Sequence, residues 1–131
     1  MAKLGKHSPK LKQLLQLDKA SVRRELGLFL VEGPKLLLEA HNGHHELREI
    51  FFDPARHDFD LGVPGWHLDA EQLDRVSEAH QGVVGLVEIR PWPDLHQYDR
   101  LVVADGLSDP GNLGTLMRSA WASGMEALVC L

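Results

Sequence analysis

Apolar and polar residues follow two different periodicities along the chain, and their succession predicts a layered protein. Short apolar runs bounded by Gly, Pro or acidic residues are typical of strands, and helical spacing separates most of these runs. The predicted strands are 28–31, 46–53, 65–69, 82–89, 101–105 and 126–131. Strands that alternate with short helices indicate an α/β fold.

Turn and capping residues set the limits of the predicted helices. Ser8 and Pro9 predict a helix start, because Ser is a favoured N-cap and Pro a favoured first helical residue. Pro34 begins another helix, which we expect to end near residues 42–43. Asp69 has the residue type and position of an N-cap. The predicted helices are 9–17, 20–26, 34–42, 70–77 and 112–123.

Two prolines on either side of Trp92, in RPWPDLHQYDR, interrupt this alternation. Because Pro restricts both itself and the preceding residue to extended conformations, the segment is interpreted as a linker. We therefore expect a first domain at 1–90, a linker at 91–99 and the start of a second domain at 100–131. The second part is a single strand–helix–strand unit, too small to cover both faces of a parallel sheet, and is expected to be incomplete.

Composition excludes several classes of protein. Apolar residues make up 44 % of the chain, which suits a packed core. No apolar run approaches the roughly 20 residues of a membrane span, and the N-terminus lacks an apolar signal segment. Cys130 is the single cysteine, so a disulfide framework is excluded and a reducing compartment is favoured. We expect a soluble cytoplasmic protein.

Charge is distributed unevenly. Residues 1–24 carry seven basic side chains against Asp18 alone, a net of +6, and the chain total of −5 therefore leaves −11 for the rest. A basic arm on an acidic body is typical of proteins that contact phosphate backbones. A solvated, lysine-rich helix explains the same charges equally well. The candidates for contact with an RNA backbone are Lys10, Lys12, Arg23 and Arg24.

The stretch from Asp105 to Gly124, DGLSDPGNLGTLMRSAWASG, places a Gly-rich turn between a predicted strand and a predicted helix. Such a turn can bind phosphate at the N-terminus of the helix. Gly106 and Gly111 have the P-loop spacing, but residues 112–113 are Asn-Leu where Lys followed by Ser or Thr is required. Gly111 and Gly114 supply only the second half of the dinucleotide motif G-x-G-x-x-G. Both common nucleotide-binding motifs are therefore incomplete.

What remains is Asp-Pro-x-Asn-x-Gly after a strand, with Arg four residues beyond the Gly. This pattern resembles the first motif of the SpoU (TrmH-like) RNA 2′-O-ribose methyltransferases of the SPOUT superfamily. FLVEGPKLLLEA and HQGVVGLVE resemble the N-terminal substrate-binding domain of that family, which is an L30e-like α/β fold. The resemblance covers nearly the whole chain, strongly at 101–124 and moderately at 20–40 and 80–90.

The resemblance implies an L30e-like substrate-binding domain followed by the first strand–helix–strand of a trefoil-knot methyltransferase domain. It also implies methyl transfer from S-adenosylmethionine to a ribose 2′-OH of rRNA or tRNA. By this resemblance Asn112 and Arg118 belong to the catalytic constellation, and Asn112 would in addition cap the helix. Arg118 suits phosphate clamping, because its planar fork bonds oxygens bidentately, whereas a role as base is difficult for a group that stays protonated. A packing face is expected at Leu113, Leu116, Met117, Ala120 and Trp121.

In the family that the chain resembles, further C-terminal motifs supply the cofactor pocket and the knot, which forms the dimer interface. The chain has no such motifs before it ends at Leu131. We therefore expect no cofactor-binding residues in this chain and no methylation by it alone, whereas the full-length protein is expected to be a homodimer. Two alternatives stay open: a stand-alone L30e-like RNA-binding module, and a nucleotide-binding strand–helix–strand protein of another class.

A run of histidines, His41, His44 and His45, suggests a zinc site at first sight. The histidines surround an Asn-Gly turn, have no cysteine nearby and lack the second half of a zinc-ligand spacing. We interpret the run as an exposed polar turn and expect no metal site.

Overall fold

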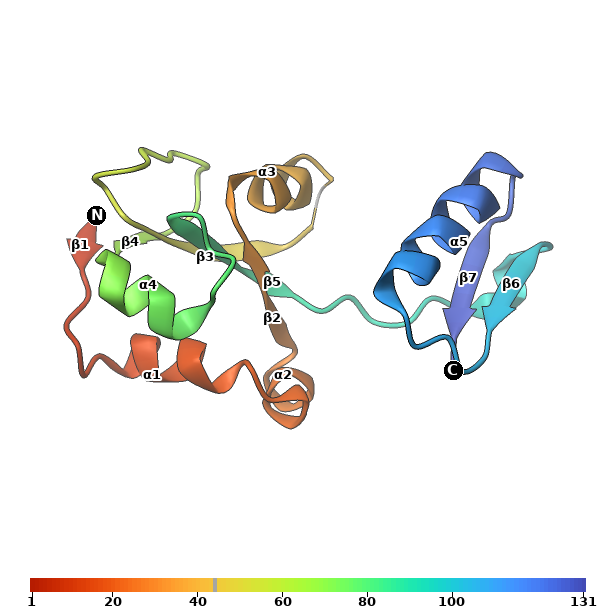
Figure 1. The fold of residues 1–131 in the computed structure, drawn as a ribbon, viewed down its shortest axis with the longest axis horizontal. Coiled ribbons are helices and arrows are strands. Elements are labelled where there is room, and N and C mark those ends of the chain that lie inside the picture. Colours follow the sequence, from red (N-terminus) through yellow and green to blue (C-terminus); the bar gives the residue numbers. More distant parts are fainter. Residues whose placement is uncertain (44) are drawn as a thin grey trace. The chain divides into compact units, whose positions relative to one another are not determined.

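The computed structural model describes residues 1–43 and 45–131, and the chain divides into two compact units (Figure 1). Unit 1 is Met1–Arg90 and unit 2 is Pro91–Leu131. Unit 1 contains β1 (Ala2–Lys3), α1 (Pro9–Gln16), α2 (Ala20–Leu26), β2 (Leu28–Glu32), α3 (Pro34–Asn42), β3 (Leu47–Phe52), β4 (Gly65–His67), α4 (Ala70–Val76) and β5 (Val83–Glu88). Unit 2 contains a 3-10 helix η1 (Leu95–Gln97), then β6 (Leu101–Ala104), α5 (Pro110–Ala122) and β7 (Ala127–Cys130). These elements confirm the α/β class.

The strands of unit 1 form one mixed sheet in the order β1-β4-β3-β5-β2. β5 is antiparallel to both of its neighbours, pairing along β2 from Leu28↔Glu88 to Glu32↔Val84 and along β3 to Phe52↔Val83. β4 is parallel to β3, and β1 is parallel to β4. Consequently β1 to β4 all point the same way, and β5 alone among the described strands of this sheet runs against them.

Helices cover both faces of this sheet, as Figure 1 shows, with α1 and α4 on one side and α3 on the other. Side chains alternate between the faces along a strand, so neighbouring residues of β3 enter different cores. The core beneath α1 and α4 includes Leu11, Leu14, Phe51, Leu73, Val84 and Leu86. The core beneath α3 includes Leu37, Ala40, Ile50, Phe52, Val83 and Val87.

Gly85 lies in the middle of β5 and lets α3 approach the sheet. A Cβ atom added to Gly85 would lie 2.6 Å from Cδ1 of Leu37 and 2.9 Å from Cγ2 of Val31. Leu37 is fully buried, so it has little room to move aside. The missing side chain at Gly85 is therefore a packing requirement of the α3 layer.

Gln72 connects the N-terminal segment to α4. Asp69 and Gln72 form a capping box, in which the backbone N–H of Gln72 donates to Asp69 and the backbone N–H of Asp69 donates to Oε1 of Gln72. The amide nitrogen of Gln72 also donates to the carbonyl of Leu4 at 3.0 Å, although Gln72 is almost completely buried. One side chain thus satisfies backbone groups of two distant segments.

Four details of the predicted pattern were wrong or missing. Ser8 precedes α1 as predicted, but its side chain makes no capping hydrogen bond. β2 extends to Glu32, one residue further than predicted, and as an edge strand it is half-buried. β1 was not predicted, since its two residues, Ala2–Lys3, carry no strand periodicity. α5 begins at Pro110, two residues earlier than expected.

Unit 2 is a strand–helix–strand arrangement in which β6 and β7 pair in parallel, from Leu101↔Ala127 to Ala104↔Cys130. α5 makes the crossover between them. No helix in the described ranges 1–43 and 45–131 is both long and apolar enough to span a bilayer.

Substitution of Gly85 by Ala is expected to destabilise unit 1. The added methyl group overpacks the contact with Leu37, so we expect the free energy of unfolding to fall by about 1–3 kcal/mol in denaturant titrations. Gly5→Ala is the matched control, because a Cβ at Gly5 meets nothing within 4 Å. Equal stability of the two variants would contradict the packing requirement.

Substitution of Gln72 by Leu preserves volume but leaves the N–H of Asp69 and the carbonyl of Leu4 without their partner. We expect the free energy of unfolding to fall by about 2 kcal/mol, the cost of stranding buried polar groups. The same substitution at the exposed Gln16 should change it by less than about 0.5 kcal/mol. A stable Gln72→Leu variant would show that water replaces the amide.

Candidate functional site

The turn between β6 and α5 is held by Asp109. Its side chain accepts a hydrogen bond of 2.7 Å from the backbone N–H of Asn112, and its backbone conformation is that of an N-cap. Pro110 follows as the first helical residue, where no N–H is needed. The expectation that Asn112 caps the helix was therefore wrong, because α5 starts earlier and Asn112 lies in its first turn.

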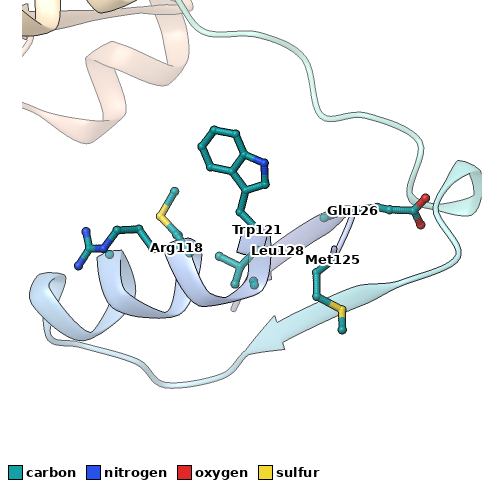
Figure 2. Close-up of a pocket in the computed structure, with 9 residues that line it drawn as sticks. Arg118, Trp121, Met125, Glu126 and Leu128 are labelled. Carbon is teal, nitrogen blue, oxygen red and sulfur yellow. The ribbon is translucent and has the colours of Figure 1, made fainter. Parts of the chain in front are cut away.

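Arg118 lies one helical turn beyond Gly114, and its side chain folds back toward the start of α5 (Figure 2). Nη2 of Arg118 donates to Oγ1 of Thr115 at 3.3 Å, and that hydroxyl donates to the carbonyl of Gly111 at 3.0 Å. A Cβ on Gly114 would lie 3.4 Å from Nη1 of Arg118. Gly114 thus leaves room for an exposed guanidinium beside the first turns of the helix.

Beyond Arg118, α5 and β7 line an open hollow of about 490 Å³. Figure 2 shows Trp121, Met125 and Leu128 around it, with Arg118 nearer the start of the helix. Trp121 is 83 % exposed, and its indole stands off the helix. The hollow is therefore an apolar surface with a cation at its margin.

The predicted packing face of α5 is only partly correct. Ala120 is buried and Leu113 and Leu116 are half-buried, as expected for residues that face the strands. Met117 and Trp121 were also assigned to this face, but both are exposed. They form a second apolar stripe on α5, which neither β6 nor β7 covers.

Glu126 also lines the hollow, but it does not have the properties of a catalytic base. The backbone N–H groups of Arg100 and Asp99 donate to its Oε2 at 2.9 and 2.8 Å. These bonds, with that of Arg100 the stronger influence, lower the pKa of Glu126 below its ordinary value. The carboxylate is therefore ionised at neutral pH and holds the chain at the start of β6.

Two of the four predicted RNA-binding residues already have partners within unit 1. Nζ of Lys10 lies 2.5 Å from Oε2 of Glu49 and 4.8 Å from the centre of the Trp66 ring. Nη1 of Arg23 donates to the carbonyls of Leu17 and Asp18, at 2.7 and 2.8 Å, and so satisfies the end of α1. Both side chains contribute to the fold of the N-terminal segment.

The other two, Lys12 on α1 and Arg24 on α2, are exposed. They are consequently the more accessible candidates for contact with RNA. In the described part of the chain no group of His, Cys, Asp and Glu side chains is arranged to hold a metal ion. His44, one of the histidines of the predicted polar turn, lies outside the described residues.

One feature near the start of β5 was not predicted from sequence. Gln81 has a φ of +46°, and among the described residues it is the only one other than glycine with a positive φ. The neighbouring Gly82 was a turn signal, but nothing in the sequence assigned the left-handed conformation to Gln81 rather than to the glycine alone.

Comparison with known proteins gives this geometry a context. Residues 8–84, more than half of the chain, match the family model described as the MRM3-like substrate binding domain. The chain is 30 % identical over 125 residues to the 23S rRNA (guanosine(2553)-2′-O)-methyltransferase RlmP of Bacillus subtilis. That alignment covers 92 % of this chain and 50 % of RlmP, and the chain spans about half the length of the curated relatives it matches.

Solved structures are similar over almost the entire chain. A crystal structure described as an RNA 2′-O ribose methyltransferase superposes with a TM-score of 0.74 and 25 % identity, covering 99 % of this chain and 55 % of that one. The SpoU methyltransferase AviRb from Streptomyces viridochromogenes, in complex with AdoMet, gives 0.70 and 26 %, covering 95 % and 53 %. The chain therefore belongs to the SpoU (TrmH-like) RNA methyltransferase family and carries its MRM3-like substrate-binding domain.

Proposed function

We propose that this protein is an S-adenosylmethionine-dependent RNA 2′-O-ribose methyltransferase in which unit 1 binds RNA and unit 2 carries the first methyltransferase motif. The observation that supports it most is Arg118, held exposed over the first turns of α5 next to an Asp109-capped turn. Relatives named as 23S rRNA methyltransferases favour rRNA as the substrate class, and tRNA is the alternative.

Arg118 fits the role of a phosphate clamp. A 2′-OH can attack a methyl group only when the nucleotide is held in register, and alignment of reactants supplies much of an enzyme's rate. The guanidinium presents a planar set of donors that matches two phosphate oxygens, and it stays protonated at any physiological pH. We therefore assign it orientation and charge stabilisation, with Thr115 supporting its position. Asn112, in the first turn of the same helix, is the second residue that we propose for the catalytic constellation.

Unit 2 does not provide all the polar groups that binding of S-adenosylmethionine requires. S-adenosylmethionine carries an adenine edge, ribose hydroxyls and an amino-acid group, each of which needs polar partners in a buried site. The hollow between α5 and β7 offers mainly apolar side chains. We propose that residues from outside unit 2 complete the pocket.

The finer architecture is also part of the proposal. We propose that residues 1–90 form an L30e-like domain, that 91–99 link it to the second part, and that 100–131 begin a trefoil-knot domain. The separate hydrophobic cores of unit 1 and the parallel pairing of β6 with β7 support this division. A homodimer of the whole protein in the cytoplasm completes it.

Unit 1 could also serve as an RNA-binding module without catalysis. Its helices cover both faces of its sheet, so it has the packing of a self-sufficient domain. This second function predicts RNA binding by the native protein without any methyl transfer, so a methyl-transfer assay separates it from the first.

The chain is expected to bind RNA with an affinity that falls as salt rises. Arg24→Ala should reduce the slope of log affinity against log salt by about 1, because one phosphate contact is lost. Arg48→Ala is the control, since Arg48 already pairs with Glu88 and its loss should leave the slope unchanged. Fluorescence anisotropy with a labelled RNA hairpin gives both slopes, and identical slopes for the two variants would remove Arg24 from the interface.

The protein as purified from its source cells is expected to methylate ribose 2′-OH groups, whereas the 131-residue chain alone is not. Arg118→Lys keeps the charge but loses the planar fork, so kcat in the native protein should fall by about 100-fold or more. Arg48→Lys should leave kcat unchanged. Transfer of labelled methyl groups from S-adenosylmethionine measures this, and full activity of Arg118→Lys would contradict the clamp.

A further inference from the structure

Three segments of unit 1 meet where β5 begins: the turn 53–57 after β3, the loop 77–82, and Gly33 after β2. The backbone N–H of Asp53 donates to the carbonyl of Gly82 at 2.9 Å, and that of Gly33 donates to the carbonyl of Val83 at 3.0 Å. Backbone bonds therefore fix all three segments relative to the end of the sheet.

His80 fixes the loop from inside. It is only 6 % exposed, and its Nδ1 accepts a hydrogen bond of 2.7 Å from the backbone N–H of Gly82. Because Nδ1 is an acceptor, the proton lies on Nε2, which donates to Asp74 at 2.8 Å. The carbonyl of His80 also accepts from the N–H of Val83. His80 is thus a positioning residue for Gln81, which lies between these anchors.

Gln81 is held in a conformation that costs any residue other than glycine some stability. Its φ is +46°, and its carbonyl lies 2.8 Å from Nε2 of His57. Glycine would adopt this backbone without strain, and within the described residues the Gln81 carboxamide makes no hydrogen bond that would explain a glutamine here. The exposed carboxamide is therefore the part of Gln81 that suggests a function in binding.

Two further planar side chains lie at the same turn, over the residue that follows Gln81. A Cβ placed on the buried Gly82 would be 2.9 Å from Nε2 of His57 and 3.1 Å from Nε of Arg56, so both side chains lie over this glycine. Cδ of Gln81 lies 3.7 Å from the corresponding position on Gly33. A guanidinium and an imidazole thus lie over Gly82, and the carboxamide of the preceding residue, in the same rigid turn, lies beside Gly33.

The chemistry of these groups indicates the kind of partner. Sequence-specific RNA recognition stacks unpaired bases on aromatic or guanidinium planes and reads their edges with hydrogen bonds. A glutamine amide offers one acceptor and two donors for such an edge. A phosphate backbone fits less well, because acidic residues lie in or next to each segment: Glu32, Asp53, Asp58 and Glu78.

We propose that Arg56, His57 and Gln81 form a surface of unit 1 that binds an unpaired nucleobase of the RNA. This inference rests on the proposed RNA-binding function of unit 1 and adds a site to it. The exposed cations Lys12 and Arg24 hold the phosphate backbone irrespective of sequence, and the Arg56–His57–Gln81 surface distinguishes unpaired bases from paired ones.

The test compares a labelled RNA hairpin, whose loop is unpaired, with a blunt RNA duplex of the same stem sequence. Gln81→Gly in the 131-residue chain removes the carboxamide and relieves the strained backbone, so the melting temperature should change by less than about 4 °C. We expect this variant to bind the hairpin roughly tenfold more weakly and the duplex as well as the unaltered chain does.

Two control variants sharpen this comparison. Gln16→Ala removes an exposed carboxamide elsewhere in unit 1 and should change neither affinity. Arg24→Ala should weaken hairpin and duplex alike, as loss of a phosphate contact does. If the unaltered chain prefers the hairpin and Gln81→Gly retains that preference, the nucleobase surface is wrong and RNA binding by unit 1 stands. If the unaltered chain binds neither RNA, both the surface and the proposed function are overturned.

Discussion

The position of β5 between β2 and β3 is the constraint on which unit 1 depends. β2 and β3 do not pair with each other. Among the described strands β2 pairs only with β5, and β5 joins it to β3, which pairs with β4 on its other edge. The side chains of β5 enter the cores on both faces, and Gly85 at its middle sets how closely α3 can approach. The turn that presents Gln81 is likewise defined by the point at which β5 begins.

The two units differ in how completely their apolar side chains are buried. Unit 1 encloses them beneath helices on both faces of its sheet, whereas α5 of unit 2 leaves Met117 and Trp121 exposed beside the hollow. Burial of apolar area supplies most of the stability of a fold, so apolar burial stabilises unit 2 less than it stabilises unit 1. Its ordered turn depends correspondingly more on hydrogen bonds, those of Asp109 at the start of α5 and of Glu126 at the start of β6.

Structural features that depend on neighbouring residues were predicted from the sequence, whereas features that depend on partners far along the chain were not. Asn112 and Arg118 belong to a contiguous motif, so their spacing alone placed both on one helix. The pairing of Lys10 with Glu49 joins residues 39 positions apart, and no periodicity reports it. Gln72 was expected only as part of a capped helix, since its bond to Leu4 spans 68 positions. The left-handed turn before β5 depends in the same way on side chains from other segments.

The order of the strands determines when unit 1 can fold during its synthesis on the ribosome. β2 and β3 are synthesised well before β5, yet neither can join the other without it. Until residue 88 has emerged from the exit tunnel, β2 has no strand to pair with and β3 has only β4. Nascent chains of this kind expose unpaired edges for the seconds that translation of the intervening residues requires. Unit 1 should therefore fold late and as a whole during translation. Until then Phe51 and Phe52 of β3 are the exposed aromatic side chains that a chaperone would most need to cover.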